Sequence, residues 1–234
     1  MHDFQTFVDY VLYTKRLEYG IAFAFMIVFA FFYTFLRTTT KEQVARAVER
    51  VAARIQGFLV PDGVFFHQGH AWARAEGDDI AAVGIDDFAT KLVGKVDKFN
   101  LPEIGSNLAQ GEKAWTMYID SKPIDMLSPV GGKVVAVNWE ALKSPDVINS
   151  DPYGKGWLLK VQTPKASATL KNLLSGELAR KWTEKVISDL MARANYNLGT
   201  VLADGGFPVN GMAKNLDSEK WDEIVKEFLL TKGQ

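Results

Sequence analysis

The feature that most constrains this chain is an apolar stretch near its N-terminus. Residues Tyr19 to Leu36, YGIAFAFMIVFAFFYTFL, form a run of 18 residues without a charge. As a helix this run would span roughly 27 Å, close to the hydrocarbon thickness of a bilayer. It is apolar on every face, unlike an amphipathic surface helix, and tyrosines lie towards both ends. The pattern predicts one retained transmembrane helix rather than a buried core helix or a cleaved signal peptide.

Basic residues flank this stretch unequally. Lys15 and Arg16 precede it, whereas Arg37, Lys41, Arg46, Arg50 and Arg54 follow it. The positive-inside tendency predicts a single-pass protein of the cytoplasmic (inner) membrane with its C-terminal domain in the cytoplasm.

We expect residues 1–37 to hold the N-terminal segment and the span, and residues 38–60 to form an amphipathic linker helix. Thr40 is the expected N-cap and Gln43 its capping-box partner. An apolar stripe follows at Val44, Val48, Val51 and Ile55, and Gly57 is expected to end the helix.

Residues 61–180 change to short apolar runs separated by glycine, proline and acidic turns. This pattern predicts a compact β-barrel or sandwich. One short helix is expected after Ile85, capped by Asp86 or Asp87.

A helical period returns in the last part of the chain, and residues 181–234 are expected to form a helical C-terminal extension. The steps of four run through Leu170, Leu174, Leu178, Trp182, Val186 and Leu190, and Gly176 is expected to split the run. A long polar connection over residues 198–216 precedes a last amphipathic helix with Asp217 as its cap. That helix can pack on its own domain or serve in docking; the docking candidates are Phe207, Met212, Trp221 and Phe228.

Composition excludes several classes of function. The net charge of −1 gives no support for nucleic-acid binding, and the absence of cysteine excludes thiolate metal sites and cysteine nucleophiles. His67 and His70 are too few ligands for zinc, because the only other histidine is the distant His2. No metal site is expected. No dinucleotide fingerprint or serine–histidine–acid pattern is present, so the chain is not expected to be an enzyme.

The middle of the chain resembles the glycine cleavage system H protein, of the biotinyl/lipoyl domain family. The resemblance rests on GHAWAR (69–74), VGIDDFATKLVGKV (83–96), NLPEIG (100–105), LSPVGGKVVAVN (127–138) and DPYGKGWLLKV (151–161). It implies a lipoyl-domain-like β-sandwich (a barrel-sandwich hybrid) over residues 61–180. The transmembrane helix and the helical extension lie outside the family pattern, and with them the expected fold class is α+β. The resemblance also implies a hairpin that presents a lipoyl-lysine.

The expected position of that lysine is occupied by serine. Counting from Gly111 and back from Ser128, the family spacing reaches Ser121, and the lysine of this chain, Lys122, is displaced by one residue. Neighbouring side chains on a strand point to opposite faces, although the rule relaxes at a turn. Serine cannot form the amide to lipoate. The pattern therefore favours a retained scaffold without its arm, with no cofactor, over lipoate attached to Lys122.

Together these features predict a non-catalytic, membrane-anchored accessory subunit that docks other protein subunits, by analogy in a respiratory or redox complex. Two alternatives stay open. One is a membrane-tethered lipoyl carrier modified on Lys122, and the other is a self-associating scaffold.

Overall fold

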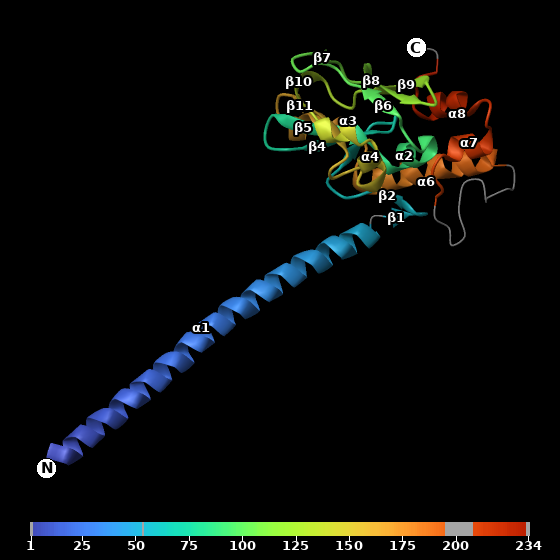
Figure 1. Cartoon of the computed structure of the whole chain (residues 1–234). Helices are drawn as coiled ribbons and strands as arrows, with labels where there is room; N and C mark the ends of the chain where they lie inside the picture. The colour runs from blue at the N-terminus through green and yellow to red at the C-terminus, as the bar shows by residue number, and fades with distance from the viewer. Residues whose placement is uncertain (1, 53, 195–207, 233–234) are drawn as a thin grey trace. The chain divides into compact units, whose positions relative to one another are not determined.

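The computed structural model describes residues 2–52, 54–194 and 208–232 (Figure 1). It divides into two compact units, residues 1–52 and residues 53–234. The expected docking residue Phe207 and most of the connection over 198–216 lie outside the described residues.

The first unit is one long helix, α1 (His2–Ala52), of 51 residues. Its segment Tyr10–Tyr33, 24 residues with a mean hydropathy of 1.5, is long and apolar enough to cross a membrane, and none of it is buried within the protein. The expected break before Thr40 is wrong, because α1 runs through this residue without interruption. No glycine or proline lies between Gly20 and Gly57, so nothing in the sequence stops the helix there.

The expected helix over residues 38–60 is also wrong at its C-terminal end. After α1 the chain forms a small hairpin of β1 (Arg54–Ile55) and β2 (Phe58–Leu59). Its two turn residues, Gln56 and Gly57, both have positive φ, as a type I′ turn requires. Phe58 is fully buried in the core of the second unit, and this burial explains why the chain leaves the helical conformation early.

The second unit contains the predicted β-sandwich. One sheet has six strands, in the spatial order β3 (Phe65–Phe66), β4 (Ala71–Ala75), β5 (Ile80–Ile85), β11 (Trp157–Gln162), β10 (Gly132–Val137) and β7 (Asn107–Leu108). A smaller sheet has the order β6 (Lys98–Asn100), β8 (Lys113–Ile119) and β9 (Lys122–Leu127). All neighbouring strands in both sheets pair antiparallel.

Large side chains from both sheets fill the interior. Trp115, Met117 and Ile124 of the smaller sheet share one buried cluster with Val83, Leu158 and Val161 of the larger sheet. Trp72 packs directly over Gly84 on the neighbouring strand, where an added Cβ would lie 2.8 Å from the indole ring. Glycine at residue 84 is therefore required by packing rather than by a turn.

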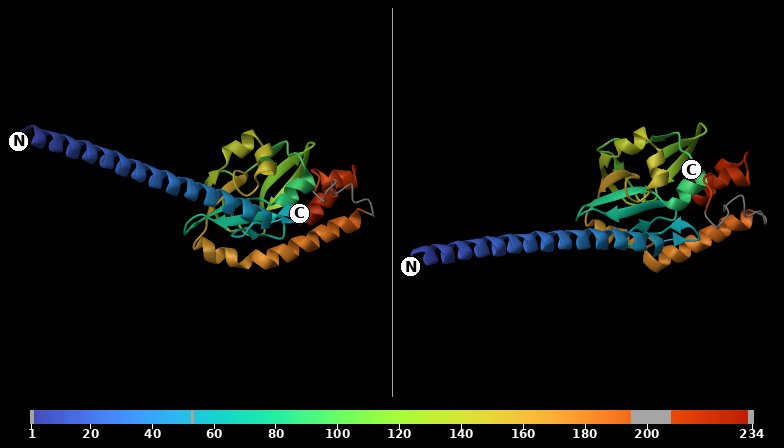
Figure 2. Two further views of the ribbon diagram at one scale, coloured as in Figure 1. Left: turned by 90° about the horizontal axis from the view of Figure 1, so that it is seen from below. Right: turned by 60° about the horizontal axis from the view of Figure 1, so that its bottom comes forward.

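Short helices close the domain between the strands. They are α2 (Asp87–Val93), α3 (Trp139–Lys143), α4 (Asp146–Ser150), α5 (Ala166–Thr169) and the 3-10 helix η1 (Leu170–Asn172). The long α6 (Gly176–Arg193) begins at the glycine that the sequence predicts as a break, and this prediction is confirmed. In Figure 2, α6 (orange) runs along one side of the domain.

The C-terminal segment packs into the same core as the sandwich. It forms α7 (Met212–Leu216), which contacts α2, and α8 (Trp221–Phe228), which contacts β9. Met212, Val225 and Leu229 are fully buried. Asp217 accepts hydrogen bonds from the backbone N–H groups of Glu219 and Lys220, so it caps the turn before α8 rather than the helix itself.

Candidate functional site at the β8–β9 hairpin

The hairpin identified from the sequence has a two-residue turn. Ile119 ends β8 and pairs with Lys122, the first residue of β9. The turn residues between them, Asp120 and Ser121, have φ values of 48° and 64°. Two successive left-handed residues define the type I′ turn that matches the twist of a hairpin. Ser121 therefore lies at the tip, and Lys122 already belongs to the strand.

This pairing decides the direction of the Lys122 side chain. Directly paired residues lie on the same face of a sheet, and that face returns every second residue. Ile119 and Ile124, which share the face of Lys122, are fully buried, whereas Pro123 on the opposite face is exposed. Lys122 is thus on the inner face, at the edge that α8 covers.

Two residues of α8 hold the Lys122 ammonium. Its Nζ lies 2.6 Å from Oδ1 of Asp222 and 5.3 Å from the centre of the Trp221 ring. The side chain of Lys122 remains 44% exposed, whereas that of Asp222 is only 17% exposed. The contact combines a charge-assisted hydrogen bond with a cation–π interaction.

Lys214, a lysine of α7, contacts the turn of the hairpin. Lys214 Nζ lies 2.5 Å from Oδ2 of Asp120 and 5.0 Å from the centre of the same Trp221 ring. The turn and the first residue of β9 are therefore both tied to the segment that follows the sandwich.

Carboxylates in this region are held in the charged form. The hydrogen bond from Lys122, aided by Lys226, lowers the pKa of Asp222 although partial burial opposes the shift. Burial likewise opposes the shift at Asp125 on β9, where bonds from Lys113 and Thr116 lower the pKa nonetheless. A carboxyl group with a lowered pKa in the folded state stabilises the fold above its unfolded pKa of about 3.9, and this stabilisation is lost as the pH falls through the folded value.

We therefore expect Asp222→Asn to lose less stability than the wild type between pH 5 and pH 3, by about 0.5–1 kcal/mol for a partly exposed pair. Thermal unfolding followed by circular dichroism at several pH values measures this difference. Glu223→Gln, an exposed change on the same helix, is the matched control and should follow the wild type. An equal loss in Asp222→Asn and the wild type would contradict the assigned ion pair.

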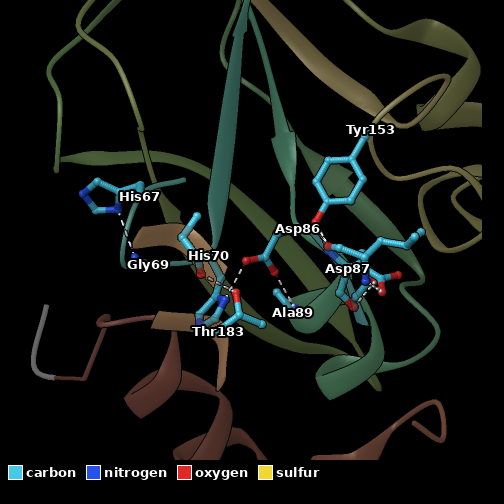
Figure 3. Close-up of polar contacts among 11 residues, drawn as sticks. His67, Gly69, His70, Asp86, Asp87, Ala89, Tyr153 and Thr183 are labelled. Atoms are coloured by element: carbon cyan, nitrogen blue, oxygen red, sulfur yellow. Dashed lines mark hydrogen bonds and ion pairs between the residues drawn. The ribbon is translucent and has the colours of Figure 1, made fainter. Parts of the chain in front are cut away.

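A second polar cluster lies inside the domain around His70 (Figure 3). His70 Nδ1 lies 2.7 Å from Oδ2 of Asp86, and the other oxygen of Asp86 accepts the N–H of Ala89 at 2.7 Å. The second bond confirms Asp86 as the N-cap of α2. The imidazole lies 4.6 Å from the Phe88 ring and 4.7 Å from the Trp182 ring, measured between centroids.

These contacts give both histidines structural partners. His70 lies in the turn before β4, with φ of 62°. His67 Nδ1 accepts the N–H of Gly69, and burial and the neighbouring His70 lower the pKa of His67 (Figure 3). Among the described residues no group of three or more His, Cys, Asp or Glu side chains could hold a metal ion.

Asp87 and Tyr153 join the β1–β2 hairpin to α2. The Asp87 carboxylate accepts the N–H of Leu59, and the Tyr153 hydroxyl donates to the carbonyl of Leu59 at 2.8 Å. The same hydroxyl accepts the N–H of Asp87. Burial and the two neighbouring carboxylates raise the pKa of Tyr153 well above its usual value, so the group stays a hydroxyl. These hydrogen bonds give the network a structural role, because they hold the β1–β2 hairpin against α2.

The expected docking side chains lie in different environments. Met212 and Trp221 are buried against their own domain, so in this conformation they are not exposed for a partner. Their burial agrees with the alternative expectation that the last helix packs on its own domain. Phe228 is half-buried and lines an open groove of about 720 Å³ between α6 and the end of α8, together with Trp182, Val186 and Leu230. Docking through Phe228 stays a prediction.

Sequence comparison gives consistent matches for the middle of the chain. A family model described as "Glycine cleavage H-protein" matches residues 64–186. A glycine cleavage system H protein of Mycobacterium avium is 42% identical over 109 residues, which cover 47% of this chain and 83% of the relative. The glycine cleavage system H protein of Carboxydothermus hydrogenoformans is 37% identical over 127 residues, which cover 54% of this chain and 96% of the relative.

A crystal structure is also similar. A glycine cleavage system H protein from Mycobacterium marinum aligns with a TM-score of 0.47 and 30% identity, over 54% of this chain and 98% of that chain. The helices α1, α7 and α8 lie outside the residues matched by the family model.

Proposed function

This chain belongs to the glycine cleavage H-protein family, and we propose that it serves as a non-catalytic, membrane-anchored accessory subunit. In this role the lipoyl-type sandwich is a docking module for other protein subunits and carries no lipoyl arm. The surrounding complex is membrane-associated, and a respiratory or redox setting follows by analogy with the redox chemistry of lipoyl carriers.

The state of Lys122 is the observation that carries this proposal. A lipoyl-lysine has to extend from the tip so that its arm can reach other proteins. The family spacing assigns that position to Ser121, which cannot form the amide, while the Lys122 ammonium is held by Asp222 and Trp221. The residues present at this tip therefore fit a lipoyl group poorly.

The proposed anchor is α1. Its segment Tyr10–Tyr33 has the length and hydropathy of a membrane span, and none of it is buried within the protein. The excess of arginine and lysine after this segment supports a cytoplasmic C-terminal domain. Tethering also limits the reach of a carrier that has to visit several soluble enzymes, which favours a fixed docking role.

A membrane-tethered lipoyl carrier is the second candidate. It is favoured by one observation, namely that Lys122 is next to the tip with 44% of its side chain exposed. In that case the ion pair with Asp222 would have to break when the amide forms.

Replacement of Lys122 separates the two candidates in the native membrane. We expect Lys122→Arg to retain the same co-purifying protein subunits in mild detergent, because arginine can keep the ion pair with Asp222 but cannot carry lipoate. The measurement is quantitative mass spectrometry of tagged full-length chains, with Lys171→Arg as the exposed control. Loss of partners or of cellular function only in Lys122→Arg would support the carrier. A single homo-oligomer without other subunits would instead support the self-associating scaffold.

A further inference from the structure

The segment after α6 contacts the hairpin in two layers. The first layer is apolar, because Trp221, Val225 and Leu229 are buried in the domain core. The second layer is polar and lies at the rim, where Lys122 pairs with Asp222 and Asp120 pairs with Lys214. Both rim ammonium groups also lie over the ring of Trp221.

The two layers differ in how easily they open. Exposure of the buried layer would cost several kilocalories per mole, since each large apolar side chain contributes about 1.5–3 kcal/mol when buried. The rim pairs are partly exposed, with 44% of Lys122 and 65% of Asp120 in contact with solvent, so their strength is modest and salt-dependent. The rim can therefore open while α8 stays in place.

We propose that residues 210–231 form a built-in clamp that closes the inner face of the β8–β9 hairpin and protects the Lys122 amine from acylation. The clamp belongs to this chain's own extension, since α7 and α8 both follow the last residue matched by the family model. It adds to the proposed function a control on Lys122, the lysine amine next to the hairpin tip.

Acylation of Lys122 requires a free amine nitrogen. In acylation the neutral amine nitrogen attacks an activated carbonyl, an N–C bond forms, the leaving group departs and the amine proton passes to buffer. Lys122 can react only after its ammonium has left the Asp222 carboxylate and the Trp221 ring and has lost a proton. Both contacts hold Nζ against α8, so the amine has to leave them before it can reach the activated carbonyl.

Chemical acetylation of the intact chain tests the clamp. The full-length protein is produced in a host without lipoate-attaching enzymes, so that Lys122 carries a free amine, and is treated in detergent with acetyl N-hydroxysuccinimide. Peptide mass spectrometry then gives the acetylation rate of Lys122 relative to Lys171, an exposed lysine for which no ion pair is found within the described residues.

We expect this relative rate to rise about three- to fivefold in Asp222→Asn, which corresponds to roughly 1 kcal/mol for a partly exposed pair. Glu223→Gln removes the same charge from the next residue of α8, which is exposed, and should leave the rate unchanged. In the wild type, salt should raise the rate of Lys122 more than that of Lys171.

Three results would overturn the clamp. One is a wild-type Lys122 that reacts as fast as Lys171, the second is an equal effect of Asp222→Asn and Glu223→Gln, and the third is a rate of Lys122 that salt does not raise relative to Lys171. Circular dichroism confirms that the variants stay folded, so a rate increase through general unfolding is separated from local opening. Because the amine is free by design, these outcomes do not depend on whether the native protein carries lipoate.

Discussion

Trp221→Ala is expected to lower the free energy of unfolding of the folded domain by about 3–5 kcal/mol. Trp221 is nearly fully buried, shares the core cluster with strands of both sheets, and lies under the ammonium groups of Lys122 and Lys214. Its truncation leaves a large cavity and removes two cation–π contacts. For a domain of this size the melting temperature should fall by roughly 6–20 °C.

The matched control is Trp139→Ala. Trp139 belongs to α3 and is 63% exposed, so its loss should change the stability by no more than about 0.5 kcal/mol. Urea unfolding of the full chain in detergent, followed by circular dichroism, compares the two variants. If Trp221→Ala were as mild as Trp139→Ala, the C-terminal segment would not be an integral part of the domain core.

Gly132→Ala is expected to destabilise the domain by at least about 3 kcal/mol. Gly132 begins β10 with φ of 152°, and a Cβ at this position would lie 2.2 Å from the carbonyl oxygen of Gln162 on β11. The clash is with backbone and cannot be relieved by a side-chain rotation. The two strands would have to separate where β10 and β11 first pair.

Gly77→Ala is the matched control, because it introduces backbone strain without a steric clash. Gly77 also has a positive φ, 84°, but no atom lies within 4 Å of the position that a Cβ would take there, so the cost should be only about 1–2 kcal/mol. The same urea unfolding compares both variants. Equal losses of stability in Gly132→Ala and Gly77→Ala would contradict the close approach of Gly132 to the Gln162 carbonyl oxygen.

Local patterns predicted much of this fold correctly. Asp86, one of the two expected caps, caps α2, and Gly176 starts a new helix. Each of these depends on residues within about one or two helical turns of one another, and such short-range rules can be recognised in a single sequence.

Long-range contacts account for what the sequence did not predict. The Lys122–Asp222 pair joins residues 100 positions apart, and no local pattern marks Asp222 or Lys214 as partners of the hairpin. The predicted end of the linker helix is wrong because burial of Phe58 favours the β1–β2 hairpin over continued helix. The contacts of His70 with Asp86, Phe88 and Trp182 likewise join residues that are distant in the sequence.

Sequence and structure each contribute to the description of Lys122. The spacing from Gly111 and Ser128 predicts a shift of one residue, but the alternation of side chains along a strand does not decide which way Lys122 points next to a turn. The two-residue turn over Asp120 and Ser121 makes Lys122 a strand residue, and the extension then supplies its partners.

The most direct test is the mass of the peptide covering Tyr118 to Lys133, from full-length protein purified from its native membrane. We expect an unmodified peptide, with Lys122 present as a free amine. A lipoyl adduct on Lys122 that disappears in Lys122→Arg would contradict this expectation and would make this chain a tethered carrier.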